Sequence, residues 1–295
     1  MTLYNGINLF FIKLFTIVVP RRLHAPFAVV WGGLFYLLLT DKRRSVKNNL
    51  RVITGKTAVG GLAFCTFYKF ARNWCDVMLM VGVTDSRLQA LIGRRSSAKP
   101  LDDALSAGNG ALLVSPHLGN WELGGLGLGD LDYKINVLTF REPDEKINAM
   151  REKVRGERGI GFIYVDRDDT SPLAAIAAVN TLRRNEVLCL LGDRDGSSNT
   201  VMVNFFGCPT PLPVGPAYLA LATGAPMIPV FVVLDDDGRY ATLMEEPIYV
   251  QGKHGANKDA IRTGMQQLAD VFERYIRQYP DQWYNFFDFW GDRKE

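Results

Sequence analysis

The residues best suited to chemistry follow the apolar run Ala111–Ser115, which the sequence pattern predicts to be a buried strand. His117 comes directly after this run and Glu122 follows five residues later. Two residues five apart on one helix point about 140° from each other. A cooperating pair therefore needs His117 in a loop and Glu122 on the next helix, with Gly119 and Asn120 forming the turn. A carboxylate that holds one imidazole nitrogen makes the other nitrogen a general base for a hydroxyl. On its own, this spacing more often marks a structural His beside an unrelated Glu.

The elements that must position this pair alternate along the chain after residue 100. Short apolar runs predict strands at Ala111–Ser115, Ile135–Phe140, Gly161–Val165, Val187–Leu191 and Met227–Leu234. Helical patterns cover Asp144–Arg155, Pro172–Arg184, Gly215–Ala222 and Asn257–Gln278. The alternation predicts an α/β fold with a largely parallel central sheet flanked by helices. Ligands bind beyond the carboxyl ends of such strands, which is where His117 lies.

The first hundred residues have a different pattern. Gly61–Val81 is apolar and aromatic without strand punctuation, which predicts a helix. Gly93–Pro100 carries turn and breaker residues and is the only stretch that resembles a linker.

The N-terminal 56 residues form a hydrophobic, basic region that we expect to be helical. They contain nine Lys and Arg residues but only one acidic residue, and hold the apolar runs Ile7–Val19 and Ala25–Leu39. Neither run reaches the roughly 20 residues that a spanning helix needs. Short apolar segments followed by a basic cluster favour an anchor in the interface of an anionic leaflet, on the cytoplasmic side. The alternative is a pair of core helices with a solvated basic face. We therefore divide the chain into a membrane-associating segment, residues 1–56, and an α/β domain, residues 57–295.

Metal and disulfide chemistry have little support in the sequence. The four cysteines form no CxxC pair, and the three histidines lack the close spacing of a metal site. We expect no metal ion, no nucleic-acid partner and a reducing cytosol.

Further motifs follow His117 in a fixed order. They are Phe140-Arg141-Glu-Pro143, then Arg158 and Arg167, the run Gly192-Asp193-Arg194-Asp195-Gly196, the blocks 203–207 and 213–217, and Thr223–Pro229. With the His-x4-Glu spacing, this ordered set resembles the glycerolipid acyltransferase superfamily. Within it, the set is similar to the branch of late acyltransferases of lipid A biosynthesis and phosphatidylinositol mannoside acyltransferases. The resemblance covers nearly the whole chain.

The resemblance implies a glycerol-3-phosphate acyltransferase-like fold and a single-step acyl transfer. A thioester of acyl carrier protein or coenzyme A would supply the acyl group, a membrane lipid hydroxyl would accept it, and no cofactor is implied. His117 would be the base and Glu122 would orient it. The expected substrate-binding residues are Asn120, Arg141, Arg158, Arg167, Asp193 and Asp195. Guanidinium groups pair well with phosphate, although a salt bridge to a neighbouring residue is an equal alternative for each arginine. The two aspartates follow a strand end and would either fix the active-site loop or hold a basic group. The implied location is the cytoplasmic face of the bacterial inner membrane.

Two departures from the lipid A enzymes leave the acceptor open. Asp-Arg-Asp replaces their usual Asp-Gln-Asp, as in the mannoside enzymes, and Phe287-Asp288-Phe289 replaces a basic pair. A lipid A precursor or related glycolipid, a lysophospholipid and a mannosylated phosphoinositide all remain as acceptors. The aromatic run 283–290 fits either an acyl channel, a lipid contact or plain core.

Three other classes of function fit parts of the sequence. A thioesterase using the same pair remains possible on the residues, but no Gly-x-Ser-x-Gly is present for a nucleophile-elbow hydrolase. The run Gly124–Gly129 does not fit the Gly-x-Gly-x-x-Gly of a nucleotide site. A non-catalytic membrane-binding module would explain the charge asymmetry alone.

Overall fold

The computed structural model describes residues 19, 23–80, 90–124, 133–141, 148–149, 152, 156, 159–165, 172–194, 199–252 and 257–291. The apolar run Ile7–Val19 and the predicted helix Asp144–Arg155 lie largely outside the described residues, and Arg158, Arg167 and Asp195 lie wholly outside them.

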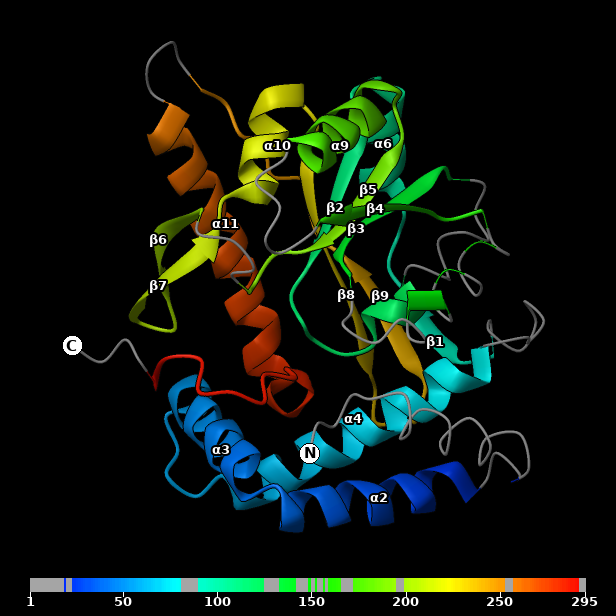
Figure 1. The fold of residues 1–295 in the computed structure, drawn as a ribbon, viewed down its shortest axis with the longest axis vertical. Coiled ribbons are helices and arrows are strands. Elements are labelled where there is room, and N and C mark those ends of the chain that lie inside the picture. The colour runs from blue at the N-terminus through cyan, green and yellow to red at the C-terminus, as the bar shows by residue number, and fades with distance from the viewer. Residues whose placement is uncertain are drawn as a thin grey trace.

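A seven-stranded sheet forms the centre of the molecule (Figure 1). Its strand order is β1-β9-β8-β2-β5-β3-β4, and β8 and β9 form its one antiparallel pair among the described strands. The strands are β1 (Ile92–Arg95), β2 (Ala111–Ser115), β3 (Ile135–Phe140), β4 (Gly161–Val165), β5 (Val187–Leu191), β8 (Met227–Leu234) and β9 (Tyr240–Met244). The predicted α/β class with a largely parallel sheet is therefore confirmed.

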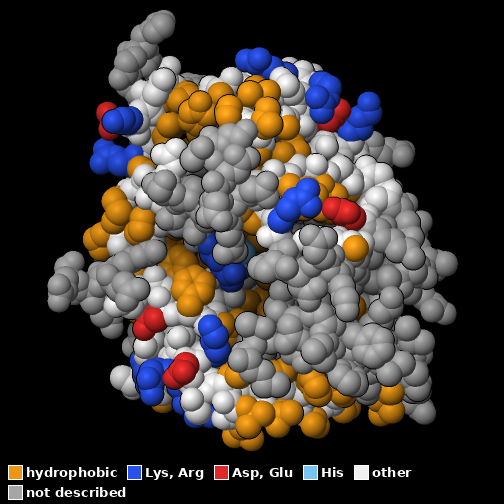
Figure 2. Space-filling view, in the orientation of Figure 1, with side chains coloured by type: hydrophobic (Ala, Val, Ile, Leu, Met, Phe, Trp, Pro, Cys, Tyr) orange, Lys and Arg blue, Asp and Glu red, His pale blue; other side chains and the backbone are white. Residues whose placement is uncertain are grey.

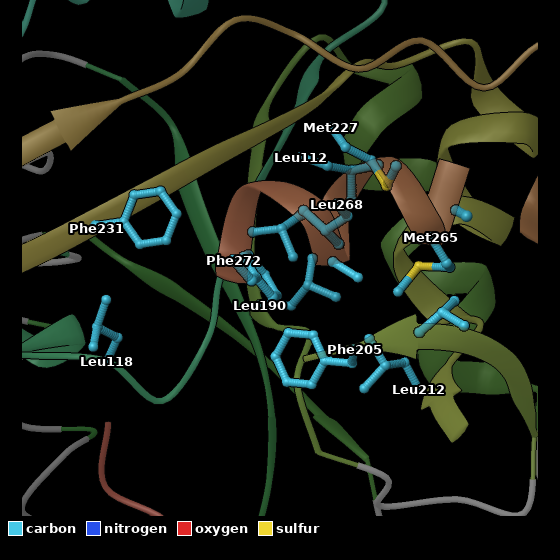
Figure 3. Close-up of a cluster of buried hydrophobic side chains, with 14 of the residues drawn as sticks. Leu112, Leu118, Leu190, Phe205, Leu212, Met227, Phe231, Met265, Leu268 and Phe272 are labelled. Atoms are coloured by element: carbon cyan, nitrogen blue, oxygen red, sulfur yellow. The ribbon is translucent and has the colours of Figure 1, made fainter. Parts of the chain in front are cut away.

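Helices cover both faces of this sheet because its central strands are buried on both sides. In β2, Leu112 and Val114 face a core formed with α9 (Leu173–Arg183), α10 (Gly215–Thr223) and α11 (Asn257–Gln278). Figure 3 shows part of this core, where Leu268 of α11 lies beside Leu112 and Phe272 lies beside Leu190. The alternate residues Ala111 and Leu113 face a second core that includes α6 (Lys99–Ser106). This packing fixes the end of β2, from which His117 follows.

A separate hairpin packs against α11 (Figure 1). It consists of β6 (Thr200–Phe205) and β7 (Cys208–Pro213), which pair antiparallel. Gln266 of α11 bonds both the backbone N–H and the carbonyl of Asn204, at 2.8 and 2.9 Å. The hairpin thereby places Phe205 and Phe206 next to the C-terminal aromatic residues.

Three helices lie together at one end of the molecule (Figure 1). They are α2 (His24–Leu38), α3 (Thr40–Thr54) and α4 (Gly60–Met80), and α4 confirms the helix predicted from Gly61 to Val81. α2 and α4 pack closely, since a Cβ on Gly32 would meet the Phe67 carbonyl oxygen at 2.8 Å. No helix within the described part of the chain combines the length and the apolar character needed to cross a membrane.

The outer face of α2 is apolar and exposed. Val30, Leu37 and Leu38 are 72%, 66% and 59% exposed. Figure 2 shows hydrophobic side chains along the edge of the molecule where α2 runs. Lys42 and Arg44, at the start of α3, are also exposed. The exposed apolar row of α2 therefore lies next to the positive charges at the start of α3. The division of the chain into two parts at residue 56 stays a prediction.

The prediction of a linker at Gly93–Pro100 was wrong in part. Its first residues belong to β1, which pairs with β9 at the edge of the sheet, and its last residues begin α6. β1 is a short edge strand with one buried residue followed by three exposed ones. Such a strand lacks the apolar run by which the buried strands were predicted.

Candidate active site

Two polar side chains emerge side by side from neighbouring strands. β2 and β5 pair in parallel, and their last residues, Ser115 and Leu191, are direct partners. His117 lies two residues beyond Ser115, and Asp193 lies two residues beyond Leu191. Equal offsets from paired residues bring the two side chains together at the carboxyl edge of the sheet. This is the edge where open α/β sheets bind ligands.

Asp193 holds His117 through both of its carboxylate oxygens. Oδ1 lies 2.6 Å from Nδ1 of the His117 ring, and Oδ2 accepts the His117 backbone N–H at 3.0 Å. The Asp193 side chain is fully buried, whereas that of His117 is 15% exposed. The carboxylate is therefore sealed behind an imidazole that reaches the surface.

The charge state of the pair follows from its surroundings. Burial alone would raise the pKa of Asp193, but the charge of His117, its hydrogen bonds and the charge of Arg194 lower that pKa to about 2. Asp193 is thus an anion at neutral pH and can only accept hydrogen bonds. The proton between the two side chains consequently belongs to Nδ1 of His117. In this tautomer Nε2 carries the lone pair and has the character of a base.

The turn after His117 is fixed by a glycine. Gly119 has φ +65°, and a Cβ there would lie 2.0 Å from the carbonyl oxygen of Val232 in β8. The same oxygen accepts the N–H of Asn120 at 2.6 Å, and Gly119 donates its own N–H to the Gln282 carbonyl at 2.9 Å. Only glycine combines this conformation with so close an approach of two backbones.

The C-terminal segment, residues 282–290, closes over the loop that carries His117. Tyr284 donates its backbone N–H to the His117 carbonyl at 2.9 Å, and Leu118 forms a bridge with Trp283. The Trp283 indole Nε1–H donates to Oδ2 of Asp193 at 2.8 Å. The partly buried Arg194 donates to the Tyr284 carbonyl and, at 2.7 Å, to Oδ1 of Asn285. Burial lowers the pKa of Arg194, and the charge of Asp193 opposes that effect.

Asn120 and Glu122 are both buried near this loop. Oδ1 of Asn120 accepts the N–H of Leu123 at 3.1 Å, which caps the helical turn of residues 121–124. Glu122 lies on that turn and is 8% exposed. The loop-then-helix arrangement expected for His117 and Glu122 is therefore present, but the carboxylate that bonds the Nδ1 of His117 is Asp193. The catalytic role of Glu122 and the substrate-binding role of Asn120 stay predictions.

Arg141 lies at the end of a neighbouring strand. It follows β3 directly, is exposed, and places its guanidinium carbon 4.3 Å from the centre of the Tyr164 ring. Arg158, Arg167 and Asp195 lie outside the described residues, so their expected roles stay predictions as well. No cluster of three or more potential His, Cys, Asp or Glu metal ligands occurs among the residues that the structure describes.

Sequence reasoning did not identify Trp283 as a partner of the site. The aromatic run was expected to line an acyl channel, to touch lipid or to be core, and the structure places Trp283 and Trp290 in the buried core. Trp283 nevertheless donates to Asp193. Nothing in its spacing along the chain points to that contact.

Over most of its length the sequence is similar to known proteins. The family model for bacterial lipid A biosynthesis acyltransferases matches residues 2–291. The chain is 29% identical over 216 residues to a phosphatidylinositol mannoside acyltransferase of Mycobacterium tuberculosis, covering 73% of this chain and 66% of that enzyme. It is 27% identical over 262 residues to a phosphatidylinositol mannoside acyltransferase of Mycolicibacterium smegmatis, covering 87% of this chain and 82% of that enzyme.

Proposed function

The chain belongs to the bacterial lipid A biosynthesis acyltransferase family, and from this membership we propose that it moves a fatty acyl group from a thioester to a lipid hydroxyl with His117 as general base. The observation that carries the proposal is the bond between His117 and the fully buried, ionised Asp193 at the carboxyl edge of the sheet. A buried carboxylate on one imidazole nitrogen is the arrangement that makes the other nitrogen a base.

The proposed reaction is one displacement at the thioester carbonyl. Nε2 of His117 takes the proton of the acceptor hydroxyl while its oxygen forms a bond to the carbonyl carbon. The carbon–sulfur bond then breaks, and the leaving thiolate receives the proton from His117. The reaction needs no acyl-enzyme. Asp193 keeps Nδ1 protonated and stabilises the imidazolium that forms in between.

Asp193 thereby takes, in this proposal, the orienting role that the His-x4-Glu spacing and the family resemblance assigned to Glu122. Glu122 is instead proposed to support the loop from the helical turn that Asn120 caps. Glu122 as a whole is 8% exposed, so it contributes a second buried acid on the turn that follows the His117 loop. Substitutions of the two acids separate the two assignments.

The proposed acceptor is a glycolipid that carries phosphate. A lipid A precursor or a related glycolipid fits the family, and a phosphatidylinositol mannoside is a second candidate because both relatives above carry that substrate in their names. Arg141, exposed at the end of β3, is a proposed phosphate contact. The proposed donor is an acyl thioester of acyl carrier protein or coenzyme A.

We also propose that the enzyme works at the cytoplasmic face of the bacterial inner membrane without needing α2 to span it. The exposed row Val30, Leu37 and Leu38 would enter the interface, and the exposed Lys42 and Arg44 beside it would face anionic headgroups. Each charge near such a surface contributes on the order of 1 kcal/mol. A lipid acceptor would then be met at the surface to which the enzyme is already bound.

The test is acyl transfer by the purified full-length protein in detergent–lipid micelles. Labelled acyl-coenzyme A and acyl-acyl carrier protein are each supplied with a lipid A precursor, a phosphatidylinositol mannoside or a lysophospholipid. Label is expected in one acceptor, and His117→Ala is expected to lose about 10²–10⁴-fold in rate. Label that appears only as free fatty acid would make the protein a thioesterase. A folded His117→Ala protein that keeps more than about a tenth of the wild-type rate would refute His117 as the base.

A further inference from the structure

One donor to the catalytic carboxylate comes from a part of the chain far from both strands. Oδ2 of Asp193 accepts the indole N–H of Trp283 as well as the backbone N–H of His117, while Oδ1 faces the imidazole. We propose that Trp283 is a positioning residue, whose N–H fixes the plane of the Asp193 carboxylate and shares its negative charge, so that it sets the basicity of His117. The proposal rests on the proposed function, because it gives Trp283 a role only through a catalytic His117.

The aromatic rings packed around Trp283 fix the orientation of its indole. Trp283 is 3% exposed, and its ring centre lies 4.8 Å from that of Phe289, 5.7 Å from that of Trp290 and 6.2 Å from that of Phe205. Rings packed on several sides leave the indole no room to rotate. The direction of its N–H is therefore set by the core rather than by the site.

The backbone that carries Trp283 is also held from two directions. Arg194 bonds the two residues that follow Trp283, through Oδ1 of Asn285 and the Tyr284 carbonyl. Asn49 of α3 donates to the carbonyls of Asn285 and Phe287 at 3.0 and 2.8 Å, and accepts the N–H of Phe289 at 2.9 Å. The segment is thus attached both to the residue next to Asp193 and to helix α3.

The expected effect on basicity has a definite sign. A donor to a carboxylate stabilises the anion by spreading its charge. Without the indole N–H, more of that charge remains to stabilise a protonated His117, so the pKa of His117 should rise. The charge of Arg194 also acts on Asp193, and Glu122 lies five residues from His117 along the chain. A substitution at Trp283 changes neither residue.

The chain offers a matched control for this experiment. Trp290 is also 3% exposed and lies in the same aromatic cluster, but its Nε1–H donates to Oγ1 of Thr210 at 3.1 Å. Trp283→Phe and Trp290→Phe therefore remove the same atoms from the same core. Only the first removes a donor from Asp193.

The measurement is the pH profile of kcat/KM for wild type and both variants, in full-length protein with labelled acyl-coenzyme A and the lipid that accepts label in the assay above. In Trp283→Phe the acid limb should move to higher pH by roughly 0.5–1 unit, with a rate loss of about three- to tenfold below it. Trp290→Phe should keep the wild-type limb even if its overall rate falls. A wild-type acid limb in Trp283→Phe, or equal shifts in the two variants, would overturn the proposal.

A second substitution covers the case in which Trp283→Phe does not fold. Benzothienylalanine incorporated at position 283 keeps the shape of the indole and replaces its N–H by sulfur, and the same shift of the acid limb is expected. The His117→Ala variant separates the two levels of the argument. If His117→Ala is inactive while neither change at position 283 moves the limb, the role of Trp283 is refuted and the acyltransferase mechanism stands. If His117→Ala is active, the mechanism itself fails.

Discussion

Replacing Asp193 by Asn should disable His117 while leaving its place in the structure nearly unchanged. The backbone N–H of His117 and the indole N–H of Trp283 both donate to Oδ2, so an oxygen must stay at that position. The Asn side chain must then turn its NH₂ group toward Nδ1 of His117. An NH₂ donor there needs an unprotonated Nδ1, so the proton moves to Nε2 and the base is lost.

The expected rate loss in Asp193→Asn can be estimated from the same substitution in Ser-His-Asp triads. In a Ser-His-Asp triad the Asp-to-Asn change keeps the geometry, imposes the wrong tautomer and lowers kcat by about 10⁴-fold. We expect a loss of about 10³–10⁴-fold in Asp193→Asn, measured as transfer of label from acyl-coenzyme A to the acceptor lipid. Circular dichroism and thermal unfolding would show that the variant is folded.

The matching change at the other buried acid is the control. Glu122→Gln removes a charge from the helical turn but leaves the bonds between Asp193 and His117 intact. Its loss should be at least tenfold smaller than that of Asp193→Asn. A folded Asp193→Asn enzyme that keeps more than about a tenth of the wild-type rate would refute the assignment. A larger loss in Glu122→Gln would return the orienting role to the His-x4-Glu pair.

The remaining predictions concern the turn, the buried charge and the surface. Gly119→Ala should lower the melting temperature more than Gly55→Ala, because both residues have positive φ but only a Cβ at position 119 meets a carbonyl oxygen, at 2.0 Å; equal shifts would show that the close approach costs nothing. Since the pKa of Asp193 falls from 3.8 to about 2 on folding, its contribution of about 2 kcal/mol is present above pH 4 and lost as the pH falls toward 2. As the pH falls from 4 to 2, the free energy of unfolding should therefore decrease less steeply in Asp193→Asn than in the wild type. Identical slopes in the two proteins would contradict the lowered pKa of Asp193. Val30→Asn with Leu37→Asn should weaken binding to anionic vesicles in high salt, because these side chains are 72% and 66% exposed on α2. If high salt alone releases the wild-type protein completely, attachment is electrostatic.

The parallel core of the fold could be predicted because burial on both faces leaves a clear mark on the sequence. All five predicted strands have the predicted bounds, since each is an apolar run between turn residues. β1 escaped prediction because it is a short, exposed edge strand. β7 carries three prolines, which argue against a strand in sequence but are accommodated in a two-stranded hairpin.

The site was predictable only in part, because the contact between Asp193 and His117 depends on the order of the strands in the sheet. The end of a buried strand identified His117 as a residue in position to react. Asp193 also followed a predicted strand, but sequence order does not reveal that β5 lies directly beside β2 while β3 and β4 lie further out. The Glu122 pairing was inferred from the His-x4-Glu spacing and from the family resemblance. Once β2 and β5 are neighbours, the equal offsets of His117 and Asp193 follow from their register.

The position of Trp283 in the chain has a consequence for when the enzyme becomes active. A chain is made from its N-terminus, so residues 282–290 leave the ribosome after every strand of the sheet. Until then Asp193 lacks its indole donor, Gly119 lacks the Gln282 carbonyl, and Asn49 lacks its three backbone partners. A product cut short before residue 282 can contain the whole sheet and still lack a complete site. We therefore expect acyl transfer to reach its full rate only after synthesis has passed this segment.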